Sequence, residues 1–208
     1  MTKPVRSAAP PAGRATPCAE ICTSSRGVDP DILEQVIYLA VEIAREGREG
    51  RRLGTLFTVG DAPGVLARSR CLILDPLAGH PEDVLRLEDH NLRETLKELA
   101  QLDGAFVICD AGVARSACRY LDAPSRGIEL PLGFGSRHMA AAAMSLATGC
   151  VAVAVSQSSV VRVFDDGELV GEILPELWLL SRHSIHLQQP YHEHHDKDIA
   201  VFTRKTDA

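Results

Sequence analysis

Apolar residues recur at helical spacing in two stretches of the chain. The first stretch follows Asp29-Pro30-Asp31 and ends at the charged, Gly-rich run 47–50. A spacing of about 3.6 residues predicts an amphipathic helix that packs against a core. The second stretch predicts another helix from about Asn91 to Leu102. The apolar positions of the first helix are Ile32, Val36, Ile37, Leu39, Ala40 and Ile43.

Short β-prone runs alternate with the helices. The runs Val160–Phe164 and Glu168–Ile173 flank Asp-Asp-Gly and predict a β-hairpin. An Ala-rich helix, Met139–Ala147, ends before Gly149. The pattern predicts a single α/β domain with a mixed central sheet flanked by helices and an antiparallel hairpin at one side. Further strands are predicted at 54–59, 70–74, 105–109, 113–120 and 151–156, and a short helix at 176–181.

The two ends of the chain lack this periodicity. Residues 1–28 are rich in Pro, Ala, Ser and Arg, a composition typical of a mobile leader. Residues 187–208 predict a polar tail, and residues 29–186 the folded domain. His192, His194 and His195 lie among acidic residues of this tail. A solvated tail is favoured over an adventitious metal site.

Composition narrows the function classes. The formal net charge of −6 argues against a broad surface for duplex nucleic acid, whereas a nucleotide needs only a few placed cations. No signal-peptide pattern precedes the scattered cysteines, so reduced thiols and a cytoplasmic location are expected. Cys18 and Cys22 have a metal-ligand spacing but no second matching pair. The longest apolar run is broken by Thr148 and Gly149, which argues against a membrane span.

A candidate anion site lies before the Ala-rich helix. Gly133-x-Gly135-Ser136 at a helix start can direct backbone N–H groups, a hydroxyl and the helix dipole toward a phosphate. Ser136 can equally be a simple N-cap beside turn-forming glycines. The next two residues, Arg137 and His138, favour the functional interpretation, because an Arg can fork onto phosphate oxygens and a His can bind a metal or a leaving group.

A candidate carboxylate lies at a predicted helix-to-strand junction. Asp103 is followed by Gly104, where the lack of a Cβ permits close approach of a ligand to the backbone. The carboxylate can bind Mg²⁺ or Mn²⁺ and orient a hydroxyl for attack on phosphorus. When this segment is taken alone, Asp103-Gly104 can equally be a turn that ends a helix, with the Asp103 side chain in solvent.

Together, Asp103-Gly104-Ala105 and Gly135-Ser136-Arg137-His138 resemble the paired motifs of the diadenylate cyclase domain. That family includes the DNA-integrity scanning protein DisA and the membrane-linked cyclases of Gram-positive bacteria. The strand 151–157, which ends in Ser156-Gln157, and the run 92–105 are also similar to the family. The resemblance covers roughly residues 31–173, and the two ends of the chain lie outside it.

The resemblance implies a specific reaction. Two ATP-loaded protomers of a homo-oligomer meet face to face, and Mg²⁺ or Mn²⁺ helps each 3′-hydroxyl attack the partner's α-phosphate. The catalytic residues would be Asp103, Arg137 and His138, with Asp103 and His138 also at the metal. Residues expected to contact ATP are Gly104, Ala105, Leu121, Gly135, Ser136, Ser156 and Gln157.

One position departs from the family pattern. A second Arg usually follows the His, and this chain has Met139. Losing an oriented cation weakens transition-state stabilisation, so an ATP or cyclic-dinucleotide sensor with slow or no turnover is the alternative function. Another cation could substitute, and the candidates are Arg115, Arg119 and Arg126. DNA binding is not expected, because the helical spine and DNA-reading domain of the scanning protein are lacking.

Overall fold

The computed structural model describes residues 16–175, 190–196 and 199–204. In these residues nine strands form one sheet in the order β2-β4-β3-β1-β5-β6-β7-β9-β8. Only the β1–β3 pair is parallel among the described strand pairs. The strands are β1 (Thr55–Val59), β2 (Ser69–Cys71), β3 (Ala105–Ile108), β4 (Ala114–Leu121), β5 (Val151–Val155), β6 (Val161–Asp165), β7 (Glu168–Pro175), β8 (Tyr191–Asp196) and β9 (Ile199–Arg204).

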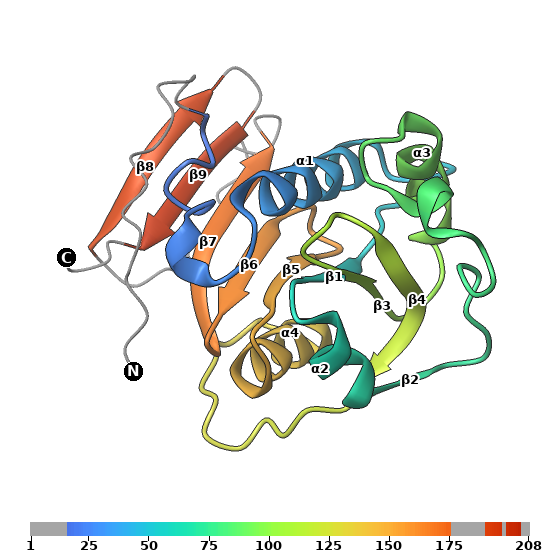
Figure 1. The fold of residues 1–208 in the computed structure, drawn as a ribbon. Helices are drawn as coiled ribbons and strands as arrows, with labels where there is room; N and C mark the ends of the chain where they lie inside the picture. The colour runs from blue at the N-terminus through green and yellow to red at the C-terminus, as the bar shows by residue number, and fades with distance from the viewer. Residues whose placement is uncertain (1–15, 176–189, 197–198, 205–208) are drawn as a thin grey trace, which may run out of the picture.

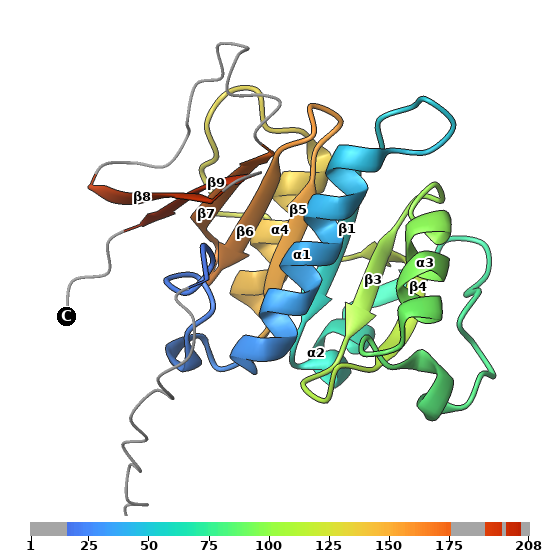
Figure 2. The ribbon, with the colours of Figure 1, turned by 90° about the horizontal axis from the view of Figure 1, so that it is seen from above.

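Helices cover both faces of this sheet (Figures 1 and 2). The central strand β5 shows why, since its valines pack in the core beneath α1 and its alanines in the core beneath α4. Successive side chains of a strand point to opposite faces, so a fully apolar strand buries both. The helices are α1 (Pro30–Glu46), α2 (Ala62–Ala67), α3 (His90–Leu99), α4 (Ser136–Ala147) and the 3₁₀ turns η1 (Ser24–Arg26) and η2 (Glu82–Leu85).

Helix α1 matches its prediction closely. The Asp29 carboxylate accepts hydrogen bonds from the backbone N–H groups of Asp31 and Ile32, and Pro30 occupies the first turn. A carboxylate at this position satisfies N–H groups that have no partner within the helix. The helix ends at Gly47, whose φ is +58°. The mixed α/β sheet flanked by helices and the β6–β7 hairpin are likewise confirmed.

The segment between β1 and β2 differs from expectation. The Gly-Asp-Ala-Pro-Gly run between the predicted strands 54–59 and 70–74 has the composition of a loop, but it begins helix α2. Asp61 caps this short helix by accepting a hydrogen bond from the N–H of Gly64, and it also accepts one from the N–H of Gly149. A run rich in Pro and Gly is typical of a turn, so the capping Asp61 and the Pro in the first helical turn were the available helix signals.

Residues 16–28, which were predicted to be part of a mobile leader, pack on the domain. Cys18 and Ile21 are fully buried in the main core. A Cβ added to Gly171 in β7 would lie 2.5 Å from the Ile21 side chain, so the close contact depends on glycine. Arg26 fixes the segment further through an ion pair of 2.7 Å with Asp165. The prediction of an unstructured segment up to Val28 is therefore wrong for residues 16–28.

The predicted polar tail contributes two strands to the sheet. Strand β9 pairs with β7, and β8 pairs with β9 at the edge. The first four residues of β9 are apolar, and Ile199, Val201 and Phe202 are buried. The polar-tail prediction is therefore wrong for residues 191–196 and 199–204, which belong to the sheet. The helix predicted at 176–181 lies outside the described residues.

Candidate functional site

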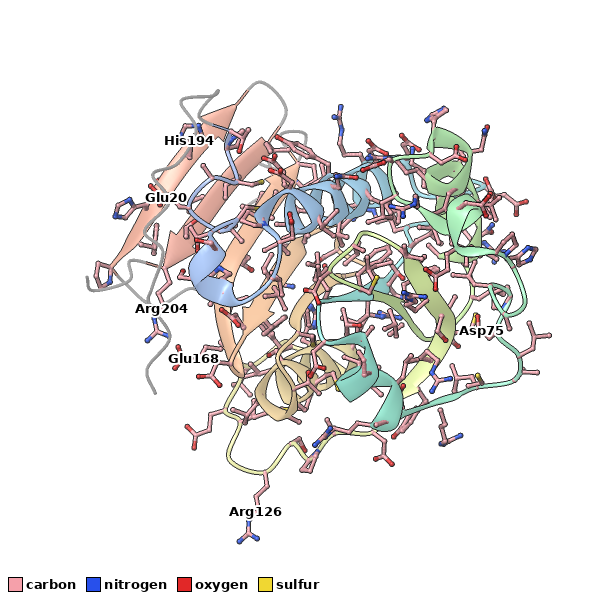
Figure 3. All side chains as sticks on the ribbon, in the orientation of Figure 1. Glu20, Asp75, Arg126, Glu168, His194 and Arg204 are labelled. Atoms are coloured by element: carbon pink, nitrogen blue, oxygen red, sulfur yellow. The ribbon has the colours of Figure 1, made fainter. Side chains whose placement is uncertain are left out.

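A cavity of about 690 Å³ lies where the start of β3, the end of β4 and the first turn of α4 meet. The segment that follows β5 completes its wall. Every residue that the sequence assigned to the site lines this cavity: Asp103, Gly104, Ala105, Leu121, Gly135, Ser136, Arg137, His138, Ser156 and Gln157. A second hollow, of about 410 Å³, lies between the loop 127–131 and the β6–β7 turn, beside the Glu168–Arg204 ion pair that Figure 3 labels.

Asp103 lies at the rim of the larger cavity with its side chain exposed. Within the described part of the chain, its carboxylate makes no hydrogen bond or ion pair. Oxygen ligands of this kind suit Mg²⁺, which is often held by one or two carboxylates together with substrate phosphates. The carboxylate is thus available to a ligand in the cavity.

Gly104 has a different structural role from the one expected. Its φ of +109° is a conformation that L side chains rarely adopt. A Cβ here would lie 2.5 Å from the carbonyl carbon of Cys118 in β4. Cys118 has a φ of +53° at an irregular part of the β3–β4 pairing. Gly104 therefore permits close packing of two strands, and no ligand contact is needed to explain it.

Arg137 is one of the two arginines that line the cavity. It occupies the first turn of α4, after Gly135, and its Nη1 would lie 2.5 Å from a Cβ placed on Gly54. A side chain at residue 54 would therefore displace the guanidinium. Arg137 has no hydrogen bond or ion pair with any described residue. Its charge is left for an anion, as expected of a phosphate-binding Arg.

His138 is buried beside the cavity, and other protein groups contact both of its ring nitrogens. Its Nε2 lies 3.1 Å from Nη1 of Arg162, and its Nδ1 lies 3.3 Å from the backbone nitrogen of Gly135. Both neighbours are N–H donors. His138 therefore fits poorly as a metal ligand in this arrangement, and in the described residues no three His, Cys, Asp or Glu side chains are placed to hold a metal.

The serine that follows β5 is engaged within its own turn. The Ser156 hydroxyl lies 2.7 Å from that of Ser158, and it accepts a hydrogen bond from the N–H of Val160. Ser156 is buried, whereas Gln157 is exposed at the cavity. Gln157 is therefore the better placed of the two predicted residues to contact a ligand.

Sequence reasoning missed part of the apolar wall. Tyr120 and Leu72 line the cavity with Leu121, and both are partly exposed. The guanidinium of Arg70 lies 4.7 Å from the centre of the Tyr120 ring. The available signal was the position of Tyr120 at the end of β4, directly before the predicted site residue Leu121. The other lining residues not predicted are Leu56, Arg119, Gly133, Ala140 and Ser158.

The cations suggested as substitutes for the missing Arg are not available at the site. Arg119 lines the cavity, but its guanidinium donates hydrogen bonds to the Ser69 carbonyl at 2.8 Å and to the Ser69 hydroxyl at 3.1 Å. Arg115 is paired with Glu82. Arg126 lies on the exposed loop after β4 and projects away from the domain (Figure 3). Met139 itself does not border the cavity.

The cysteines are free thiols, and Cys18, Cys118 and Cys150 are buried. Burial raises the pKa of Cys18 to about 12, and the nearby Glu34 carboxylate raises it further. Burial likewise raises the pKa of Cys150 to about 12. Thiols with such values stay protonated near neutral pH and are poor nucleophiles.

Comparison with known proteins identifies the family. The model of the DAC family, described as DisA bacterial checkpoint controller nucleotide-binding, matches residues 42–169. The chain belongs to this family. Its match includes both halves of the cavity wall, from Asp103 to His138.

Two curated relatives of the DAC domain are each described as a diadenylate cyclase. The protein from Methanocaldococcus jannaschii is 46% identical over 149 residues, which are 71% of this chain and 47% of the relative. The protein from Haloferax volcanii is 38% identical over 151 residues, 72% of this chain and 55% of the relative. The chain thus spans about half the length of the curated relatives it matches.

Comparison with solved structures finds two bacterial chains, each 19% identical to this one. One, described as a hypothetical membrane spanning protein from Bacillus cereus, has a TM-score of 0.45 and covers 66% of this chain and 59% of its own length. The other, a double mutant of DacA from Staphylococcus aureus, has a TM-score of 0.42 and covers 67% of this chain and 84% of its own length. In this DAC domain, none of the helices in the described ranges has the length and apolar character needed to cross a membrane.

Proposed function

We propose that this DAC domain is a diadenylate cyclase that condenses two ATP molecules into cyclic di-AMP. The observation that carries the proposal is the single cavity bordered by Asp103 and by the first turn of α4, two segments distant in sequence. Both present charged groups without a protein partner in the described residues. The curated relatives named diadenylate cyclase support the same reaction.

The cavity suits ATP in size and in polarity. Its volume of about 690 Å³ lies within the range of about 300–1,000 Å³ usual for small-molecule sites. We place the triphosphate at Ser136 and Arg137, where a helix N-terminus and a guanidinium favour anions. The adenine would rest on the apolar wall of Leu121, Tyr120 and Leu72.

The proposed reaction forms two equivalent bonds. The 3′-oxygen of one ATP attacks the α-phosphorus of the other, a new P–O bond forms, and the bond from the α-phosphorus to the bridging oxygen breaks. Pyrophosphate leaves with the electron pair of that bond. Asp103 orients the hydroxyl and accepts its proton, while Arg137 stabilises the charge that develops on the phosphate. The same step, with the roles of the two nucleotides exchanged, closes the ring.

A divalent cation fits the cavity through Asp103, whose carboxylate has no partner in the described residues. Mg²⁺ or Mn²⁺ bound there would supply positive charge beside the phosphates. The nitrogens of His138 face N–H donors, so we assign His138 to the phosphate-binding wall and not to the metal.

A homo-oligomer with facing cavities would bring the two nucleotides together. Exposed apolar side chains near the cavity mouth support such an interface, because burying them against a second copy is favourable. Tyr120 is 47% exposed and Leu72 is 38% exposed at the cavity, and Leu132, beside Gly133, is 98% exposed. Sedimentation of the Tyr120→Asp variant, which is expected to be monomeric and inactive, tests this interface.

The decisive assay is incubation of the purified protein with ATP and Mn²⁺ or Mg²⁺, followed by mass spectrometry of the products. Cyclic di-AMP that disappears in Asp103→Asn supports the cyclase. ATP binding by calorimetry without any product would support the sensor alternative instead. Absence of both binding and product would contradict the nucleotide site itself.

A further inference from the structure

A cation and an aromatic ring face each other at the edge of the sheet, beside the larger cavity. Arg70 in β2 pairs directly with Tyr120 in β4, so their side chains lie on the same face of the sheet. The Cζ atom of Arg70 lies 4.7 Å from the centre of the Tyr120 ring. A cation within roughly 6 Å of a ring centre is attracted by the ring quadrupole. The two side chains therefore form a cation–π pair.

The two members of this pair differ in their relation to the cavity. Tyr120 lines the cavity, whereas Arg70 does not. Within the described ranges neither side chain makes a hydrogen bond or an ion pair. The Tyr120 side chain is also half-exposed, and such a ring has more than one rotamer available. Arg70 is thus the neighbour that can favour one position of the ring.

The backbone beneath the pair is held by the residue before Tyr120. Nη2 of Arg119 donates a hydrogen bond to the carbonyl of Ser69 at 2.8 Å, and its Nη1 donates one to Sγ of Cys71 at 3.1 Å. A single guanidinium of β4 therefore bonds the residues on both sides of Arg70. These bonds hold β2 in register with β4, so the Arg70 backbone stays opposite Tyr120.

We propose that Arg70 is a positioning residue that holds the Tyr120 ring at the cavity, where the ring stacks on the adenine base. The inference rests on the proposed function, in which the adenine lies on the wall that includes Tyr120. A ring that occupies its binding position for only part of the time binds with an affinity reduced by that fraction. Arg70 thus raises the affinity for a nucleotide that carries a base, and not the affinity for its phosphates alone.

The test compares two ligands by calorimetry in the presence of Mg²⁺. One is 3′-deoxy-ATP, which lacks the attacking hydroxyl and is not turned over, and the other is tripolyphosphate, which has no base. Arg70→Gln should lower the affinity for 3′-deoxy-ATP by about 2- to 5-fold, the worth of an exposed cation–π contact. The affinity for tripolyphosphate should match that of the control Arg68→Gln. Arg68 is a nearby exposed cation that bonds the Gly64 carbonyl instead of the ring.

Removal of the ring shows whether Arg70 acts through it. Tyr120→Leu keeps an apolar side chain but loses the stacking surface, so the affinity for 3′-deoxy-ATP should fall by at least about 5-fold. In this background Arg70→Gln should have no further effect, because no ring is left to position. In the wild-type background Arg70→Lys should keep most of the affinity, since an ammonium also makes a cation–π contact.

The same measurements contain the results that would overturn the positioning role. An unchanged affinity in Arg70→Gln would show that the ring does not need the cation. An equal loss for both ligands, or an equal loss with and without the Tyr120 ring, would show that the charge acts on its own. Dissociation of an oligomer by Arg70→Gln in sedimentation would assign the residue to the interface instead. A wild type that binds 3′-deoxy-ATP with the expected pattern but makes no cyclic di-AMP would refute only the cyclase, and one that binds no nucleotide would refute both.

Discussion

Charged residues are arranged differently in two regions of the molecule, the α1–α3 face and the cavity. On the α1–α3 face the buried Lys97 lies 2.9 Å from Glu94 and 3.0 Å from Glu42. Arg48 likewise lies 2.7 Å from Glu98. In the cavity, Asp103 and Arg137 have no such partners among the described residues. Charges that satisfy each other stabilise a fold, whereas charges left without partners at a cavity are the ones available to a ligand.

The largest expected effect comes from the cavity carboxylate. Asp103→Asn keeps the size of the side chain and removes its charge, so cyclic di-AMP formation should fall by about 10²- to 10⁴-fold. Because Asp103 bonds no described residue, the free energy of unfolding should stay within about 0.5 kcal/mol of the wild type. Initial rates and urea unfolding measure the two effects. Full activity in this variant would remove Asp103 from the mechanism.

The second-largest effect is expected from Arg137 in the cavity wall. Arg137→Gln removes the charge that is proposed to face the phosphates, and we expect turnover to fall by about 10²- to 10³-fold. ATP affinity, measured by calorimetry, should fall as well, since in the proposed function the guanidinium contacts the nucleotide before and during the reaction. Gly54→Ala should reproduce part of the loss, because its Cβ would occupy the place of the Arg137 guanidinium. Unchanged affinity in both variants would place the triphosphate elsewhere.

On the α1–α3 face, removing a charge should lower stability and leave activity unchanged. Lys97→Met leaves Glu42 and Glu94 without their buried cation, and we expect a loss of about 1–3 kcal/mol in the free energy of unfolding. The specific activity of the folded protein should not change. A variant with wild-type stability but impaired turnover would undo the distinction between the two regions.

The same face also predicts a pH dependence. A hydrogen bond from Lys97 lowers the pKa of Glu94 below its ordinary value, while desolvation opposes the shift. Its contribution to stability is therefore complete above the unfolded value of about 4.3 and is lost as the pH falls through the lowered folded value. Urea unfolding between about pH 6 and pH 3 should show a steeper acid loss in the wild type than in Lys97→Met. Equal slopes would show that the pair does not contribute.

The sequence predicted the site better than it predicted the edges of the domain. The cavity segments carry Gly, Asp, Ser and Arg in an order that chemistry and family resemblance both explain, so their meeting around one cavity could be foreseen. The stretches 16–28, 190–196 and 199–204 have mixed, polar compositions, and long-range contacts such as Ile21–Gly171 and the β7–β9 pairing show that they belong to the domain. Long-range contacts of this kind leave no periodic signal in a single sequence.

The role of His138 shows the limit of motif reasoning inside the site. A His after Ser-Arg was expected at the metal, and the sequence placed it correctly at the cavity. The partner that occupies its Nε2, Arg162, lies 24 residues away on β6. A buried Arg in an otherwise apolar strand was the available signal, and its cross-strand Glu172 appears only once the hairpin register is known.

The smallest expected effect concerns the departure from the family pattern. Met139 does not border the cavity, so Met139→Arg should leave turnover within error of the wild type. Steady-state rates at saturating ATP are the measurement. A clear gain in activity would show that a cation from this position reaches the phosphates and that the natural enzyme is limited by its absence.

The most direct test of the central claim is a crystal structure with 3′-deoxy-ATP and Mn²⁺, since this analogue binds as ATP does but lacks the attacking hydroxyl. The proposed function predicts the triphosphate against Ser136 and Arg137, with the ribose and metal on the side of Asp103. Nucleotide bound instead in the smaller hollow beside Arg204, with the larger cavity unfilled, would contradict it.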